Sequence, residues 1–330
     1  MLAYIKDQKT FETKHKATAK YDMTLQSIYD EVTSIYLPGT ERNVVKGDFI
    51  YCDGYLGIIV EIDDTEKDML TLTCHDIVTL FRRDLLPTTD SSATGIEGFI
   101  RRQIMQNYVN VADTVYRLPF INVSTITTTP SDVTPTIEDG VWNIKSFIAK
   151  VRRTYGVFTD VAMAGKNTLN ITIQKMEPPK HNIDLSTSGF EVLEEATNIE
   201  SIGKITAFAE DTGKTTNWYL LQDGTITQAY TASNRVDGRW DTLIVDEAIN
   251  VEQEVRNRFA ENSYSHIIEF ATHKQYGFYD GCVLRTRKGK VLQSYISAVR
   301  KKSDDDRIIY KTGELRTTLD QKLNLIFGGK

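Results

Sequence analysis

The sequence predicts a mainly β protein with a few helices, an α+β class built from two similar antiparallel β-barrel domains and smaller α/β insert domains. Three observations predict this class. Short runs rich in Val, Ile, Thr, Tyr and Phe recur along the chain and are broken by Gly, Asp and Asn, a pattern typical of strands and turns. Segments with helical periodicity are few. The two ends of the chain carry the same order of turns and strands.

Strand-like runs extend over the whole sequence. They are residues 49–51, 57–62, 69–74, 157–163, 168–174, 218–221, 266–272 and 307–311. The runs at 157–163 and 168–174 flank AGKN, residues 164–167, which is a good hairpin turn. We therefore expect these two runs to pair as antiparallel neighbours.

Helices are expected in a few places only. The candidates are residues 25–34, 77–83, 97–108, 142–155 and 251–262. The segment at 97–108 places Ile100, Ile104 and Met105 on one helical face, and the segment at 251–262 does the same with Val251 and Phe259. The segment at 25–34 has only a weak helical pattern.

The start of the chain contains a three-strand pattern. Gly47 begins a strand, Gly54 turns it, and a return strand runs from Gly57 to residue 62. The acidic turn DDTEKD, residues 63–68, leads to a third strand at 69–74. This order predicts an antiparallel meander.

The end of the chain repeats the pattern loosely. Gly281 begins a strand, Lys288 and Gly289 turn it, and a return strand covers 291–299. The charged turn KKSDDD, residues 301–306, leads to the third strand. Two similar meanders indicate two similar barrels, so these glycines are interpreted as structural residues, mainly turn residues that supply a positive φ.

Three polar segments divide the chain. They are LPTTDSSATG at 86–95, the Thr- and Pro-rich segment at 124–140, and EPPKHN at 177–182. We expect four parts: a first barrel at 1–90, a helix-plus-hairpin domain at 91–185, a β-rich domain or start of the second barrel at 186–250, and a helix with the closing strands of the second barrel at 251–330.

Composition excludes several classes of protein. A length of 330 residues predicts more than one domain, and a net charge of -6 argues against generic binding to nucleic acid or anionic membrane. Three widely spaced cysteines do not form a disulfide framework, and Cys52 and Cys282 are expected to be buried. No apolar run approaches the length of a membrane span, and the N-terminus lacks the apolar core of a signal peptide.

No local motif predicts catalysis, a cofactor or a metal. Gly213, Lys214 and Thr215 resemble the end of a phosphate-binding loop, but Phe208 stands where its first glycine is required. A polar hairpin turn is the simpler interpretation. The five histidines show no metal-ligand spacing, and the carboxylate clusters at 63–64, 194–195 and 304–306 lie in charged, turn-like contexts.

Basic residues are concentrated near the C-terminal end. They are Arg285, Arg287, Lys288, Lys290, Arg300, Lys301 and Lys302. One interpretation is a solvated sheet edge, because lysines protect edges from unwanted pairing. The other is an interface with an acidic neighbour or a surface that passes DNA.

Residues 27–86 resemble the N-terminal barrel of phage tail and baseplate hub proteins. The matching elements are a G-D-x-I opening at Gly47 to Ile50, with Asp48 in second place, and a G-I-I return at Gly57 to Ile59. A D-I-x-x-L-F-x-R strand end follows at Asp76 to Arg83, and it includes Phe81. The helix at 97–108 and the segment at 289–315 also fit this family, so the resemblance spans nearly the whole chain.

The resemblance implies a tube-type barrel fold and a structural role. The expected protein is a homotrimer whose three subunits place six barrels in a ring at the distal end of a phage tail. Such a ring adapts a sixfold tail tube to a threefold tip and gates the passage of DNA and tape measure. The implied partners are a distal tail or tube protein, the tape measure protein and tail tip or fibre proteins, and the implied location is the virion after assembly in the host cytoplasm.

The resemblance implies no enzyme, cofactor or metal. Many relatives continue into a fibre or cell-wall hydrolase, whereas this sequence stops at GGK, residues 328–330. Two alternatives remain: the hub of a phage-derived injection system or bacteriocin, and a carbohydrate-binding or carbohydrate-cleaving β protein. The structural positions predicted to matter are Gly47, Asp48, Gly54, Gly57, Asp76, Phe81, Gly281 and Gly289.

Overall fold

The fold is mainly β with few helices, as predicted. The computed structural model describes residues 1–26, 32–40, 43–89, 95–129, 136–137, 141–175, 180–197, 201–221, 225–260, 266–289 and 291–313. The chain divides into two compact units. The first contains Met1–Ala149, Val157–Lys175 and Val299–Ile308, and the second contains Lys150–Gly156, Met176–Ala298 and Ile309–Lys330.

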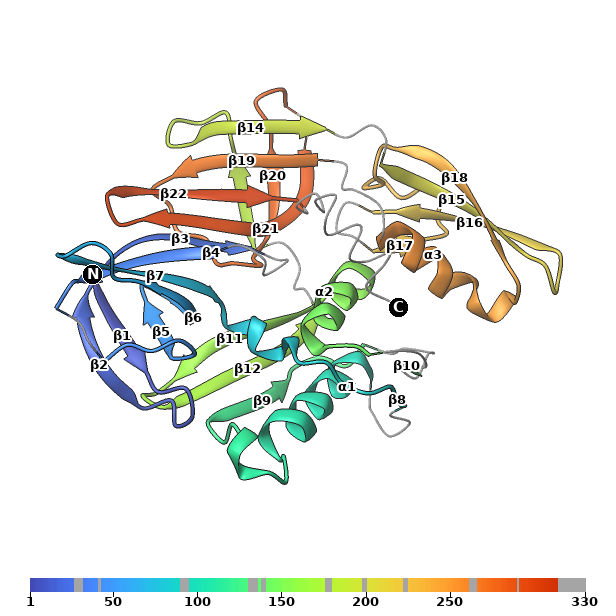
Figure 1. The fold of residues 1–330 in the computed structure, drawn as a ribbon. Coiled ribbons are helices and arrows are strands. Elements are labelled where there is room, and N and C mark those ends of the chain that lie inside the picture. The colour runs from blue at the N-terminus through green and yellow to red at the C-terminus, as the bar shows by residue number, and fades with distance from the viewer. Residues whose placement is uncertain are drawn as a thin grey trace. The chain divides into compact units, whose positions relative to one another are not determined.

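Seven antiparallel strands form the first part of unit one (Figure 1). They are β1 (Leu2–Lys6), β2 (Thr13–Thr18), β3 (Lys20–Gln26), β4 (Val32–Pro38), β5 (Phe49–Cys52), β6 (Tyr55–Asp63) and β7 (Met69–Asp76). Their order across the sheet is β3-β4-β7-β6-β5-β1-β2. Alternate side chains point into one apolar cluster that includes Ile5, Ile35, Ile59, Leu72 and Cys74, because successive strand residues face opposite sides of a sheet.

The rest of unit one contains its helices and a small mixed sheet. The elements are η1 (Ile77–Arg82), β8 (Thr88–Thr89), α1 (Gly95–Ile104), the π-helical η2 (Met105–Val109), η3 (Thr114–Tyr116), β9 (Ile121–Thr125), β10 (Thr136–Ile137), β11 (Val157–Ala164) and β12 (Thr168–Lys175). Helix α2 (Ile144–Tyr155) contributes residues to both units. Strands β11 and β12 form the predicted hairpin across residues 164–168, and β9 pairs in parallel with β12.

The described residues of unit two form two groups of strands and two helical elements, besides the end of α2. The elements are β13 (His181–Asp184), β14 (Glu191–Thr197), β15 (Ile202–Ala209), β16 (Lys214–Leu220), β17 (Ile226–Thr227), β18 (Arg239–Val245), η4 (Ala248–Asn250), α3 (Val251–Ala260), β19 (His266–Thr272), β20 (Gly281–Arg285), β21 (Val291–Lys302) and β22 (Asp305–Thr312). One sheet has the order β17-β16-β15-β18, and α3 packs on one of its faces through Val255 and Phe259 (Figure 1).

The two predicted meanders are present. Strands β5, β6 and β7 pair in sequence as antiparallel neighbours, and β20, β21 and β22 are likewise consecutive. Residues 299–308, which are the end of β21 and the start of β22, belong to unit one, where β21 is the neighbour of β3. Closure of either group of strands into a barrel stays a prediction.

Most predicted helices are confirmed, and one is wrong. Residues 97–108 form α1 and η2, residues 142–155 contain α2, and residues 251–260 form α3. The helix predicted at 25–34 is wrong at both of its ends, because Leu25 lies in β3 and Val32 begins β4, and residues 27–31 lie outside the described residues. From Val32 onward burial alternates with a period of two, and Thr33, Ile35 and Leu37 point inward, so strand pairing overrides a weak helical pattern.

Candidate functional site

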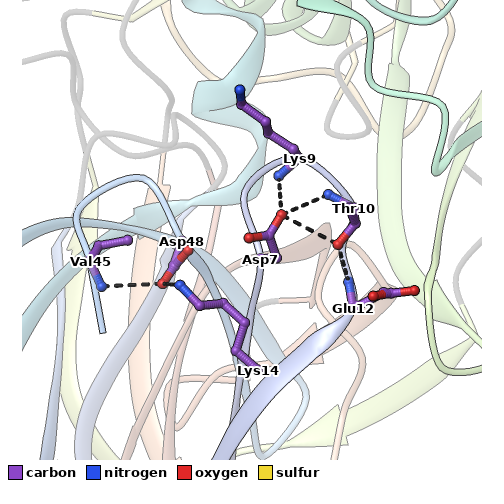
Figure 2. A network of polar contacts seen from close by, with 7 residues as sticks. All are labelled: Asp7, Lys9, Thr10, Glu12, Lys14, Val45 and Asp48. Atoms are coloured by element: carbon purple, nitrogen blue, oxygen red, sulfur yellow. Dashed lines mark hydrogen bonds and ion pairs between the residues drawn. The ribbon is translucent and has the colours of Figure 1, made fainter. Parts of the chain in front are cut away.

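The first meander opens on a partly buried ion pair. Gly47 has a φ of +92° and its N–H donates to the carbonyl of Ile59 at 2.8 Å. The next side chain, Asp48, is fully buried and accepts hydrogen bonds from Lys14 Nζ at 2.7 Å and from the Val45 N–H at 3.2 Å (Figure 2). The ion pair ties β2 to the start of the meander, so this pair has a structural function.

A capped turn supports the strand that carries Lys14. Asp7 Oδ1 accepts from the N–H groups of Lys9 at 2.8 Å and Thr10 at 2.9 Å, as Figure 2 shows. Thr10 Oγ1 in turn accepts from the Glu12 N–H at 3.3 Å. These backbone donors, that of Thr10 first, hold the pKa of Asp7 below its usual value because they stabilise the carboxylate. Such a network matches an Asx-type turn rather than a ligand site.

The predicted glycines serve different local needs. Gly54 has a φ of +82° and forms a two-residue turn with Asp53, whose φ is +49°. Gly57 lies in β6, where a Cβ would collide with the Tyr55 ring. Gly289 has a φ of +80° and lies in a turn, and Gly281, predicted to begin a strand, is the first residue of β20 and pairs with Tyr295.

Asp76 and Phe81 lie where the first meander ends. Asp76 Oδ1 accepts from the Val78 N–H at 2.8 Å and so caps η1. Burial raises the pKa of Asp76 to about 6, because desolvation penalises the charged carboxylate. Phe81 is fully buried and contacts Tyr108 edge-on, with ring centroids 5.0 Å apart. This pair connects η1, which directly follows β7, to η2.

Three of the seven clustered cations form ion pairs at the tip of the second meander. Arg300 reaches both oxygens of Asp22 at 3.1 and 3.0 Å, and Lys302 reaches the same carboxylate at 3.1 Å. Lys301 lies 3.7 Å from Asp53. These contacts lower the pKa of Asp22, and the Arg300 hydrogen bond is the largest cause.

Backbone contacts extend this junction. The Ser303 N–H donates to the Tyr21 carbonyl at 3.0 Å, and the Tyr21 N–H donates to Ser303 Oγ at 3.2 Å. The Tyr21 hydroxyl donates to Asp53 at 2.8 Å. The tip is therefore bound in unit one by charge and by backbone pairing together.

Three other members of the basic cluster remain exposed. Arg285 ends β20, and Arg287 and Lys288 lie in the turn that the Gly289 N–H closes on the Thr286 carbonyl at 2.9 Å. Lys290 lies outside the described residues. The cluster thus divides into a paired half at the tip and an exposed half at the β20–β21 turn.

The motifs considered for chemistry have ordinary structural surroundings. Residues 210–213 form the predicted hairpin turn between β15 and β16, and Thr215 pairs across from Phe208. His181 Nε2 contacts Asp280 at 2.8 Å, and the Gly277 N–H also donates to Asp280 at 2.7 Å. The part of the chain that the structure describes holds no group of three His, Cys, Asp or Glu side chains placed for a metal.

Two further findings concern the cysteines and the helices. Cys52, Cys74 and Cys282 are free and buried, and burial raises the pKa of Cys52 to about 11. Among the described helices, none has the length and apolarity needed to cross a membrane.

The sequence did not reveal an aromatic face on the β15–β18 sheet. Opposite α3, Lys204 lies across from Tyr219 and Trp240 on the neighbouring strands, and its Nζ is 3.8 Å from the Trp240 ring centroid. Trp240 is 63% exposed and Ile244 is 64% exposed on the same face. The parallel β15–β18 pairing brings these residues together from distant positions, so spacing alone could not indicate them.

Comparison with solved structures identifies the fold. A prophage tail protein, gp18, from Listeria monocytogenes EGD-e matches with a TM-score of 0.57 and 9% identity, over 99% of this chain and 98% of that chain. A tail protein from Neisseria meningitidis MC58 matches with a TM-score of 0.56 and 12% identity, over 94% and 96%. The chain has the fold of phage tail proteins.

A third tail protein extends the comparison. The 43 kDa tail protein of prophage MuSo2 from Shewanella oneidensis has a TM-score of 0.51 and 12% identity, over 95% of this chain and 98% of that chain. No family model and no curated protein matches the sequence. The resemblance to phage tail proteins that the sequence predicts is therefore confirmed at the level of the fold.

Proposed function

We propose that this chain is a structural protein of a phage tail, and that three copies form the hub ring at the distal end. The observation that carries the proposal is the tail-protein fold, which extends over 99% of the chain in the comparison with the Listeria prophage protein. The ring adapts a sixfold tube to a threefold tip and gates the passage of DNA and tape measure. Its neighbours are a distal tail or tube protein, the tape measure protein and tip or fibre proteins.

The internal repeat supports a ring of three. Each copy carries two meanders of the same strand order, so three copies supply six similar units. A closed ring also covers sheet edges that would otherwise pair with other chains. Strand β14, at one end of the sheet order, carries exposed Glu191, Glu194 and Glu195 and a bulge near Leu193, both of which discourage open pairing.

The oligomeric state tests this proposal. We expect mass photometry and light scattering of the purified chain to give a trimer, and negative-stain images to show closed rings. Crosslinking in purified tails provides the same measurement for the assembled form. A chain that is monomeric both in solution and in tails would overturn the ring.

We further infer that the chain has no hydrolase activity of its own. The carboxylates at 63–64 are exposed, and Glu194 lies 4.0 Å from Lys311 rather than in an apolar pocket. A general acid needs a neighbour or burial that shifts its pKa toward the working pH. Purified protein should leave peptidoglycan and surface polysaccharide intact in a zymogram. Clearing that is lost on substitution of Asp63 and Asp64 would contradict the inference.

A further inference from the structure

Within one chain, the tip of the second meander contacts residues near the first meander, and this contact shows how two meanders can be joined. Within unit one, the end of β21 carries Arg300 and Lys301 just before the second turn of the second meander, and these cations contact Asp22 in β3 and Asp53. Asp53 belongs to the first turn of the first meander. The junction therefore joins the basic end of β21, beside the second turn of the second meander, to Asp22 and to the acidic first turn of the first meander.

The second turn of the first meander is acidic, and its carboxylates have no ion-pair partner among the described residues. This acidic loop, residues 63–68, exposes Asp63, Asp64, Glu66 and Asp68 against a single lysine. Its backbone is held in place, because the Gly39 N–H donates to the Asp68 carbonyl at 2.9 Å and the Thr65 N–H donates to Asp63 at 3.0 Å. Within the described ranges these carboxylates form no ion pair.

The first turn of the second meander is basic, and its cations have no carboxylate partner among the described residues. This basic turn, residues 286–289, places Arg287 and Lys288 at its two central positions, and both side chains are exposed. Neither cation has a carboxylate partner in the part of the chain that the structure covers. These two ends have opposite charge, and both are pre-formed turns.

We propose that the acidic loop of one copy contacts the basic turn of the next copy in the ring. The inference rests on the proposed trimeric ring. In such a ring two kinds of junction alternate, one within each chain and one between chains. Within the chain, the second meander contributes the end beside its second turn, and the first meander contributes its first turn. Between copies, the first meander contributes its second turn, the acidic loop, and the second meander contributes its first turn, the basic turn. The charges are again complementary.

Charge also disfavours contacts between like ends of two copies. Two acidic loops repel each other, and so do two basic turns, which disfavours two-fold contacts between like ends. An acidic loop and a basic turn form a head-to-tail contact, and head-to-tail contacts generate closed rings when the rotation closes. The contact thus determines which ends of two copies meet, and the ring follows from the proposed trimer.

Charge reversal tests the contact in the full-length chain. We compare the wild type with Arg287→Glu/Lys288→Glu, with Asp63→Lys/Asp64→Lys, and with the variant that combines all four changes. Lys9→Glu/Lys214→Glu is the control, because it reverses two exposed lysines outside both turns and changes the net charge by the same amount as the Arg287/Lys288 reversal. Mass photometry over a dilution series gives the concentration at which half of the chain is assembled.

Each two-residue reversal should raise that concentration by about tenfold or more, because several surface ion pairs become repulsive. The four-residue variant should recover most of the loss, and the control should match the wild type. Trimers of unchanged stability in both reversals would overturn the contact and leave the ring standing. A wild type that never trimerises would instead overturn the proposed function, and the contact with it.

A crosslink provides a second readout that does not depend on affinity. Asp64→Cys/Arg287→Cys should give covalent dimers and trimers under oxidation, both in solution and in purified tails. Each single variant should stay uncrosslinked, because Cys52, Cys74 and Cys282 are buried. A double variant that forms trimers yet gives no crosslinked ladder would contradict the contact. Thermal unfolding of every variant establishes that it is folded.

Discussion

The two meanders share their strand order and distribute their loops in opposite ways. In the first, a two-residue turn joins β5 to β6 and the longer acidic loop joins β6 to β7. In the second, the longer basic connection joins β20 to β21, and the short turn at Ser303 joins β21 to β22. The third strands, β7 and β22, have the same length of eight residues.

The two meanders share their buried core and differ in the loops at their ends. Both meanders keep a buried apolar row, with Ile59 in β6 and Ile296 in β21 fully buried. Their ends differ in length and in charge, and β21 extends to 12 residues so that its tip reaches Asp22 in unit one. The two meanders therefore repeat the same strand order and the same buried core. Their ends differ, and the ends make the contacts with other elements, such as the contact of the β21 tip with Asp22.

The largest effects should come from the shared core. Ile59→Ala and Ile296→Ala each leave a cavity in a fully buried row, so each should lower the free energy of unfolding by about 2–5 kcal/mol. Denaturant titration followed by circular dichroism measures both. Val291→Ala is the control, because Val291 is 52% exposed and its truncation should have little effect. A large loss at only one isoleucine would show that the two cores are not equivalent.

The ends of the third strands should respond differently to pH. Asp76 ends β7 with a pKa raised to about 6, whereas Thr312 ends β22 and donates to the Ile268 carbonyl at 3.3 Å. A raised carboxyl pKa means that the folded state binds the proton more tightly than the unfolded state. The contribution of Asp76 to stability is then fully present below its unfolded pKa near 4 and is lost as the pH rises through about 6.

Asp76→Asn should remove this dependence. The amide oxygen still accepts from the Val78 N–H, so the variant should be more stable than the wild type by about 1–3 kcal/mol at pH 7. The advantage should vanish near pH 4. Thr312→Val should cost about 1 kcal/mol at every pH, because it removes only a neutral hydrogen bond. An Asp76→Asn variant that is destabilised equally at both pH values would contradict a raised pKa of Asp76 in the folded state.

Local pattern was sufficient for much of this fold. The hairpin of β11 and β12 follows from two alternating runs and the AGKN turn, and both meanders follow from turns at fixed places between apolar runs. The helix expected at 25–34 failed because short segments with mixed spacing do not distinguish a helix from strands. Tertiary pairing of β4 with β7 decides that region.

Long-range pairing is what the sequence could not predict. The parallel pairs β13–β20 and β15–β18 join segments far apart in the chain, and no local signal records such a partner. The same limit applies to the basic cluster. Its members are adjacent in sequence, yet Arg300 contacts Asp22 while Arg287 remains exposed, a division that depends on where β21 ends.

The junction at the tip should give an effect of intermediate size. Asp22→Asn removes the carboxylate that Arg300 and Lys302 share. Because these side chains are partly exposed, the loss in unfolding free energy should be only about 1 kcal/mol. Hydrogen exchange at 299–308 is the more sensitive measurement, and protection there should fall. Asp64→Asn, at the unpaired acidic loop, is the matched control and should leave this protection unchanged.

Acid should reproduce the effect of that substitution. The pKa of Asp22 is lowered in the folded state, so its contribution is present above the unfolded value near 4 and is lost as the pH falls through the lower folded value. Exchange protection of the tip, corrected for the intrinsic pH dependence of the rate, should therefore decline below about pH 4. Protection that is independent of both pH and Asp22 would mean that the Tyr21–Ser303 backbone bonds alone hold the tip.

The smallest effects should come from the two first turns. A Cβ at Gly54 or at Gly289 would meet no heavy atom within 4 Å, so only the positive φ opposes alanine, at a cost of up to about 1 kcal/mol. The turns still differ. Gly54 stands in a two-residue hairpin turn in which both residues have positive φ, and such a turn sets the register of β5 against β6. Gly289 stands in a longer connection that can absorb a change of backbone angle.

Chemical denaturation should therefore show a loss of about 1 kcal/mol for Gly54→Ala and a smaller loss for Gly289→Ala. Gly54→Asn is the control, because asparagine tolerates the left-handed region and should recover part of the loss. Equal losses at the two glycines, with no recovery by asparagine, would show that the short turn is no more constrained than the long one.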